Sequence, residues 1–118
     1  MSSATIADAL REFLTLNELL DNAYWETSTL AHKDFVYDII SILHHELSEL
    51  NKLSIQDHHY PYEIITEGIR HLKAKLESLS DQSENIVLRT SSRLDLHETI
   101  TEVVKILDQQ NHSSGDFK

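Results

Sequence analysis

Residues 36–50, VYDIISILHHELSEL, contain the most regular pattern in the sequence. Apolar side chains recur there at alternating steps of four and three residues, at Val36, Ile40, Leu43, Leu47 and Leu50. That spacing places all of them on one narrow stripe of an α-helix, the kind of stripe that packs against other helices. The stretch therefore predicts a long amphipathic helix in a helical protein.

Three further stretches repeat the pattern, and we expect helices at about 3–22, at 61–79 and in the last third of the chain. Their stripes are Ile6, Leu10, Phe13, Leu16 and Leu20; Tyr62, Ile65, Ile69, Leu72, Leu76 and Leu79; and Leu96, Ile100, Val103 and Leu107. Large aromatic side chains bury much apolar area, so we expect Tyr24, Trp25, Tyr37 and Tyr62 to close the ends of the core. Aromatic residues near loops can instead anchor a partner, and Tyr60 is the best candidate for that role.

The ends of these helices are marked by capping residues. Thr27, Ser28 and Thr29 offer hydroxyls that accept from free backbone N–H groups. The helix that contains the stripe at 36–50 should therefore start there and end near Lys52. Pro61 suits the first turn of the third helix, because its missing N–H would be unpaired there. Gly68 then falls in mid-helix, which we interpret as close approach of a neighbouring backbone.

The last third contains a conflict. Extending its stripe backwards would place Arg93 and Arg89 on the buried side of a continuous helix. A break near Thr90–Leu94 resolves the conflict, with Asp95 capping the final helix and Glu98 completing a capping box.

Short connections between long helices favour antiparallel neighbours. The expected fold is all-α: an antiparallel up-and-down four-helix bundle over residues 1–110, with a flexible tail at 111–118. Paired hairpins from two chains would build the same core as a homodimer.

The composition restricts the function. The chain has 118 residues, a net charge of -10, two glycines, one proline and no cysteine. A surface this negative repels phosphate backbones, so we expect no nucleic-acid partner. No apolar run reaches the length of a membrane span, and no signal peptide is evident, so we expect a cytoplasmic protein that does not contact membranes.

Eight histidines are many for this length, and two pairs, His44-His45 and His58-His59, are adjacent. At about 100° per residue, His45 points away from the buried stripe. His45 and Glu49 are one turn apart, and His58 or His59 could join them as metal ligands from the connector at 54–60. Exposed histidines without a ligand are the simpler interpretation.

His45 also lies in a local resemblance. The segment from Phe35-Val36 through His45-Glu46-Leu47 resembles the H-box of sensor-kinase dimerisation domains. The following Ser48-Glu49-Leu50 lacks the Arg and Pro of that motif, and no glycine-rich nucleotide-binding lobe is present. The resemblance implies phosphotransfer through an exposed His45.

Catalytic motifs are missing: no serine lies in a Gly-x-Ser-x-Gly turn, and no glycine-rich phosphate loop occurs. We therefore expect a non-catalytic protein without a cofactor, acting as an adaptor or regulatory module that binds another protein, a basic one or a second copy of itself. Metal binding or phosphotransfer by the histidines, and inhibition of a basic protein by mimicry of a polyanion, are the alternatives. The expected contact region comprises His44, His45, Glu49, His58, His59 and Tyr60.

Overall fold

The structure, a computed structural model, describes the backbone of residues 4–86 and 90–116 and the side chains of 4–86 and 92–109. Within these ranges it is all-helical, without a named strand, which confirms that the fold is all-α. The longer helices are α1 (Ile6–Glu26), α2 (Leu30–Asn51), α3 (Leu72–Asp81) and α5 (Thr90–Asp116); the short elements are η1 (Ile55–Asp57), η2 (Gly68–His71) and α4 (Ser83–Ile86). None of the helices in these ranges combines the length and apolar character needed to cross a membrane.

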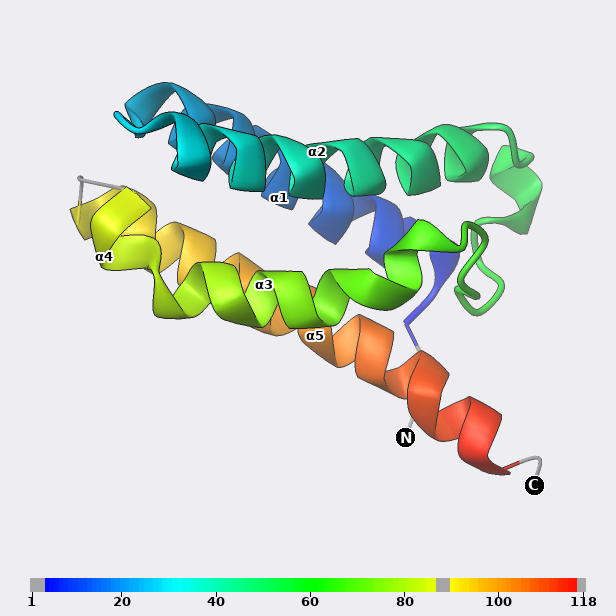
Figure 1. Cartoon of the computed structure of the whole chain (residues 1–118). Helices are drawn as coiled ribbons and strands as arrows, with labels where there is room; N and C mark the ends of the chain where they lie inside the picture. Colours follow the sequence, from blue (N-terminus) through cyan, green and yellow to red (C-terminus); the bar gives the residue numbers. More distant parts are fainter. Residues whose placement is uncertain (1–3, 87–89, 117–118) are drawn as a thin grey trace.

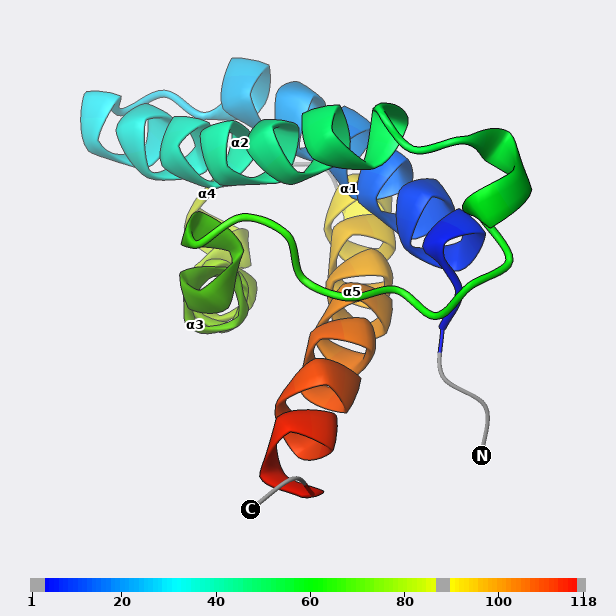
Figure 2. The same cartoon turned by 90° about the vertical axis from the view of Figure 1, so that its right-hand side faces the viewer.

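The helices lie in two layers. α1 and α2 form one layer as an antiparallel hairpin, and α3 and α5 form the other (Figure 1). α1 packs against α2 and α5, and α3 packs against the same two helices. The layers cross at a marked angle, as Figure 2 shows.

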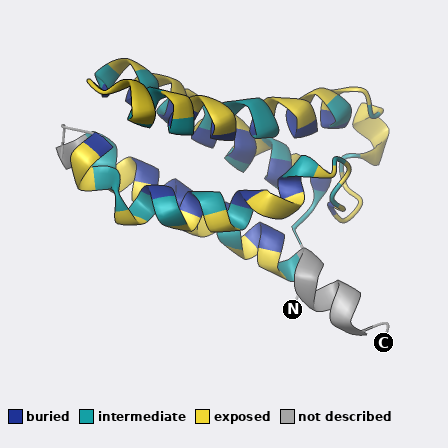
Figure 3. Ribbon diagram, in the orientation of Figure 1, coloured by how far each residue is buried: buried dark blue, intermediate teal, exposed yellow. Residues whose placement is uncertain are grey.

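The core fills the space between the layers, and Figure 3 shows the buried residues on the facing sides of the helices. Most stripe residues predicted from the spacing are buried there. Leu10 and Ile40 are only partly buried, and Ile39 takes a core position beside Ile40. The prediction of burial is wrong for Ile65, which has 44% of its surface exposed.

The N-terminus of α1 is capped twice. The Thr5 hydroxyl accepts from the Asp8 N–H, and the Asp8 carboxylate accepts from the Thr5 N–H, which makes a capping box. The connector supplies the other cap, because the carbonyls of Tyr60 and His58 accept from the N–H groups of Ile6 and Ala7 at 2.9 and 3.0 Å. The connector is therefore fixed to the start of α1.

The predicted start of α2 is confirmed, whereas the predicted end of α1 is not. Thr29 caps α2 by accepting from the His32 N–H, as one of the three candidate hydroxyls, and α2 ends at Asn51. The prediction that α1 ends near Asn22 is wrong, because the helix continues through Tyr24 and Trp25 to Glu26.

The prediction of a helix starting at Pro61 is also wrong. Residues 61–67 are non-helical, η2 begins at Gly68 and α3 at Leu72. Pro61 pairs with Thr5 in an isolated antiparallel bridge, and the Tyr62 N–H donates to the Ala4 carbonyl. Tertiary hydrogen bonds thus hold this segment extended in spite of its helical spacing.

Gly68 does not mark a close approach of backbones, contrary to our interpretation. A Cβ at this position would lie 3.8 Å from Cγ1 of Ile42, which is ordinary contact with a side chain. The backbone of Gly68 also has no positive φ. Nothing in the packing around it requires glycine.

The expected break at Thr90–Leu94, with Asp95 as a cap, is wrong, because α5 is continuous from Thr90. Arg93 is half-buried and lines a shallow groove with Ser83 and Glu84. Its long aliphatic stem makes that position tolerable on a continuous helix. Arg89 lies outside the described residues. The division into a domain at 1–110 and a tail at 111–118 stays a prediction, although the helical backbone extends to Asp116.

Candidate functional site

An aromatic cluster lies at the turn between α1 and α2. The Tyr24 and Trp25 rings pack edge to face with centroids 5.3 Å apart, and Tyr37 of α2 lies 6.4 Å from Tyr24. The Lys33 ammonium lies over the Tyr24 ring at 4.5 Å and donates to the Tyr24 carbonyl. Lys33 therefore packs on one side of the cluster and joins the start of α2 to the end of α1.

Tyr24 is partly buried against the core, but Trp25 and Tyr37 do not close it as we expected. Trp25 is 72% exposed and Tyr37 61% exposed, whereas Tyr62 is buried as predicted. The helical register explains the position of Tyr37, because it is two turns from His44 and so shares the polar face of α2. Size alone had suggested burial, but the register places both aromatic rings in solvent.

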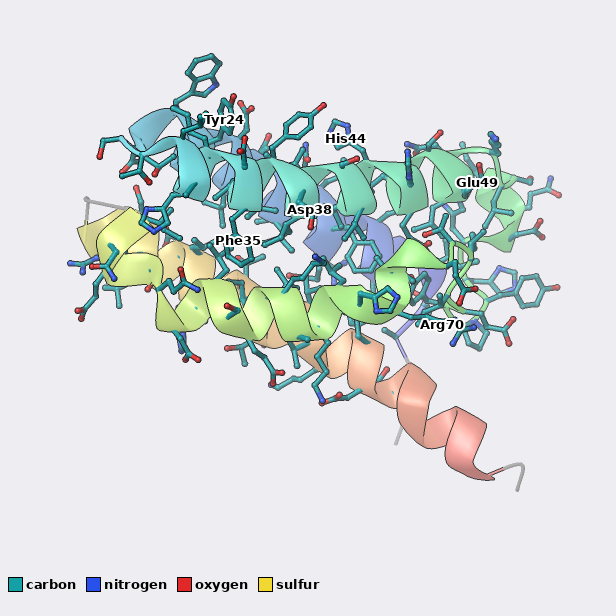
Figure 4. All side chains as sticks on the ribbon, in the orientation of Figure 1. Tyr24, Phe35, Asp38, His44, Glu49 and Arg70 are labelled. Carbon is teal, nitrogen blue, oxygen red and sulfur yellow. The ribbon has the colours of Figure 1, made fainter. Side chains whose placement is uncertain are left out.

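A shallow groove continues from the cluster between the two helices. Leu14 and Asn17 line it from α1, and His44, Leu47, Ser48 and Asn51 line it from α2. Asn17 and Tyr24 are seven residues apart, as are Tyr37 and His44, so the groove and the cluster follow the same line. We call this surface the outer seam and define it by Leu14, Asn17, Tyr24, Trp25, Tyr37 and His44. Figure 4 shows Tyr24 and His44 on the edge of the hairpin that faces away from α3 and α5.

The rim of the outer seam is negative. Glu18, Asp21 and Asp34 are exposed, and none of them forms an ion pair with another described residue. Asp38, one turn after Asp34, differs, since its carboxylate accepts from the Lys75 ammonium of α3 at 2.6 Å. Carboxylates without a counter-ion therefore border exposed aromatic rings.

The contact residues predicted from the sequence are distributed over separate places. His44 lies in the outer seam. His45 and Glu49 line a second shallow groove with Ile65 and Thr66, and the Glu49 carboxylate accepts from Lys52 at 2.8 Å. His45 is exposed, as its register predicted.

The connector residues lie at the N-terminal end of α1. His58 is partly buried there, and its carbonyl caps the helix. His59 and Tyr60 are exposed, and their rings stack with centroids 4.3 Å apart. In the part of the chain that the structure describes, no three His, Asp or Glu side chains are placed to hold one metal ion. The histidines thus do not form the combined ligand set that the metal hypothesis requires.

One serine and one histidine do meet, on α3 and α5. Ser80 Oγ lies 2.7 Å from Nδ1 of His97, at an exposed position. Activation of a nucleophile by histidine usually needs a third group that orients the base. No carboxylate among the described residues bonds to His97, so the pair gives no basis for catalysis.

The sequence interpretation missed a buried carboxylate. Glu46 is fully buried, and it accepts from the Tyr62 hydroxyl, from the N–H groups of Ile65 and Thr66, and from the Thr66 hydroxyl, at 2.6 to 2.9 Å. Burial, and then the hydrogen bond to Glu46, raise the pKa of Tyr62. The spacing did contain the signal, because Glu46 lies three residues after Leu43 and four before Leu50, on the buried stripe. Its role is to hold residues 62–66 on α2.

No protein-family model, curated protein or solved structure shows significant similarity to this chain.

Proposed function

We propose that the chain is a non-catalytic adaptor or regulatory module that binds another protein through the outer seam. One observation supports this most strongly: Trp25 and Tyr37, 72% and 61% exposed, both contact Tyr24 in one aromatic cluster at the surface. Leu14, 50% exposed, lies three turns earlier on the same face of α1 as Trp25. Single exposed apolar residues are ordinary, but contiguous ones rimmed by polar groups mark interaction sites. Tyrosine and tryptophan are also the residues most enriched among interface anchors.

We infer that the rest of the fold is the scaffold for this surface. α1, α2, α3 and α5 each contact two of the others, which fits an up-and-down four-helix bundle with the outer seam on one side. The stripe residues of α1 and α2 are committed to the core, so the outward side chains are available to a partner. Phosphotransfer through His45 stays a prediction; its exposure is compatible with that role but also with a solvated histidine.

Site-directed photo-cross-linking in an extract of the native cells tests this function. A photoreactive phenylalanine analogue at His44 lies in the outer seam, and the same analogue at Tyr60 is the control on the connector. We expect a discrete protein adduct from position 44, and we expect the combined Trp25→Ala and Tyr37→Ala substitutions to abolish it.

A second variant compares this surface with the region expected from the sequence. Substitution of His45, His59 and Tyr60 by alanine should leave the adduct from position 44 in place. No adduct at position 44, an adduct insensitive to Trp25 and Tyr37, or an adduct lost only in the triple variant would refute the proposal.

A further inference from the structure

We propose that the occupant of the outer seam is a basic amphipathic helix of a partner protein. The inference rests on the proposed function and adds the chemistry of the partner.

The spacing suits a helix lying along the hairpin. From Leu14 to Trp25 is eleven residues of α1, or roughly 16 Å at the rise of an α-helix, which is about three turns of a partner helix. Leu14, Glu18, Asp21 and Trp25 follow one another at steps of four, three and four residues, so they form one line on α1. A partner helix can meet Leu14 and Trp25 with apolar side chains about three turns apart, which leaves the carboxylates of Glu18 and Asp21 for side chains between them.

The charges select a basic partner. Glu18 and Asp21 lie between the apolar ends of the line, and Asp34 lies one turn before Tyr37 on α2. The nearest cation, Lys33, is turned toward the Tyr24 carbonyl at 2.8 Å and the aromatic rings. Lysine or arginine on the flanks of the partner's apolar stripe would pair with the three carboxylates and speed association.

The same charges disfavour the other occupants. A second copy in a two-fold dimer would bring the acidic surface of one copy against the same acidic surface of the other, in a chain whose net charge is -10. An anionic lipid surface or a nucleic acid would meet the same repulsion. A basic helix is the occupant that satisfies both the apolar line and its rim.

A designed peptide tests the chemistry directly. The probe is a fluorescein-labelled helix of about 18 residues with Leu and Trp on one stripe and Lys on its flanks. Control peptides carry Glu in place of Lys, or Ser in place of Leu and Trp. By fluorescence anisotropy we expect the Lys peptide to bind, and both controls to bind about tenfold more weakly or worse.

Variants of the chain show where the peptide binds. The paired Trp25→Ala and Tyr37→Ala substitutions should weaken binding about tenfold. Glu18→Gln with Asp21→Asn should weaken it about threefold and reduce its salt dependence. Glu63→Gln with Glu98→Gln removes the same charge from exposed positions elsewhere and should leave the affinity unchanged. Circular dichroism confirms that each variant is folded.

Each contrary outcome has a defined meaning. Equal binding of the Glu peptide, or equal loss in the control charge variant, overturns the inference. A wild-type dimer in sedimentation that Trp25→Ala makes monomeric identifies a second copy as the occupant and also overturns it. If the cross-linked adduct depends on Trp25 and Tyr37 but the Lys peptide does not bind, the inference fails and the proposed function stands.

Discussion

The Tyr62 hydroxyl donates to Oε2 of Glu46 across 2.6 Å in the interior of the protein. Tyr62 also packs edge to face on Phe13 of α1, with ring centroids 5.4 Å apart. Tyr62 thus joins α2 to α1 through opposite parts of one side chain. None of the ion pairs among the described residues includes Glu46, and its carboxylate instead accepts four hydrogen bonds.

Replacing Glu46 by alanine should lower the free energy of unfolding by about 3 kcal/mol, because buried donors lose their shared acceptor. Denaturant unfolding measures the loss, and hydrogen exchange should show faster exchange of the Ile65 and Thr66 amides. Glu49→Ala, one turn further along α2, is the control and should change stability little. Unchanged protection of those two amides would contradict the role assigned to Glu46.

Replacing Tyr62 by phenylalanine should remove a pH dependence on the alkaline side. Because the folded state raises the pKa of Tyr62, its contribution is present below the ordinary tyrosine pKa of about 10 and is lost as pH rises toward the raised value. Stability measured on both sides of about pH 10 should therefore fall less in Tyr62→Phe than in the wild type. Tyr60→Phe should keep the wild-type dependence, and an equal slope in all three proteins would argue against this coupling.

Replacing Gly68 by alanine should leave stability unchanged or raise it, by up to about 1 kcal/mol. The new Cβ has room beside Ile42, and alanine loses less backbone entropy on folding. Thermal melting checks the result. A clear destabilisation would show that the glycine is required after all.

Replacing Trp25 or Tyr37 by alanine should cost less than about 1 kcal/mol in stability, because most of each ring is already in solvent. Phe13→Ala is the internal comparison, and its loss should be about 3–5 kcal/mol, since Phe13 is fully buried. Equilibrium unfolding of the three variants measures the difference. A loss at Trp25 comparable to that at Phe13 would mean that the aromatic cluster belongs to the core.

Replacing Asp8 by asparagine should flatten the acid side of the stability profile. The Thr5 N–H, and then the Thr5 hydroxyl, lower the pKa of Asp8, so its contribution is present above about pH 4 and is lost as pH falls through the lowered value. The carboxylate is largely exposed, and the effect should be about 0.5 kcal/mol. Unfolding at successively lower pH should show it, with Asp21→Asn as the charge-matched control. Identical profiles for Asp8→Asn and wild type would exclude the capping box as a source of acid sensitivity.

The sequence predicted most of the core, because a stripe that repeats at helical spacing has few ways to be buried. Leu43, Leu47 and Leu50 lie where that spacing placed them. The errors occur where distant groups decide local structure. The spacing of Tyr62, Ile65 and Ile69 is helical, but Glu46 holds the amides of this segment and the helix starts later.

The outer seam could have been located in part from the sequence. Tyr37 and His44 share a face by register alone, and that face contains polar residues. We instead assigned Trp25 and Tyr37 to the core by their size, which ignores that register. The contact between Tyr24 and Tyr37 depends on the pairing of α1 with α2, which no local pattern specifies.

Because the connector caps α1, the order of synthesis determines when the N-terminal end of this helix is completed. The amides of Ile6 and Ala7 are translated about fifty residues before the carbonyls of His58 and Tyr60 that cap them. Until then water must solvate these two amides, and the first turn of α1 is capped by the Thr5–Asp8 capping box alone. The N-terminal end of α1 is therefore completed only after residues 58–60, which follow α2, have been translated.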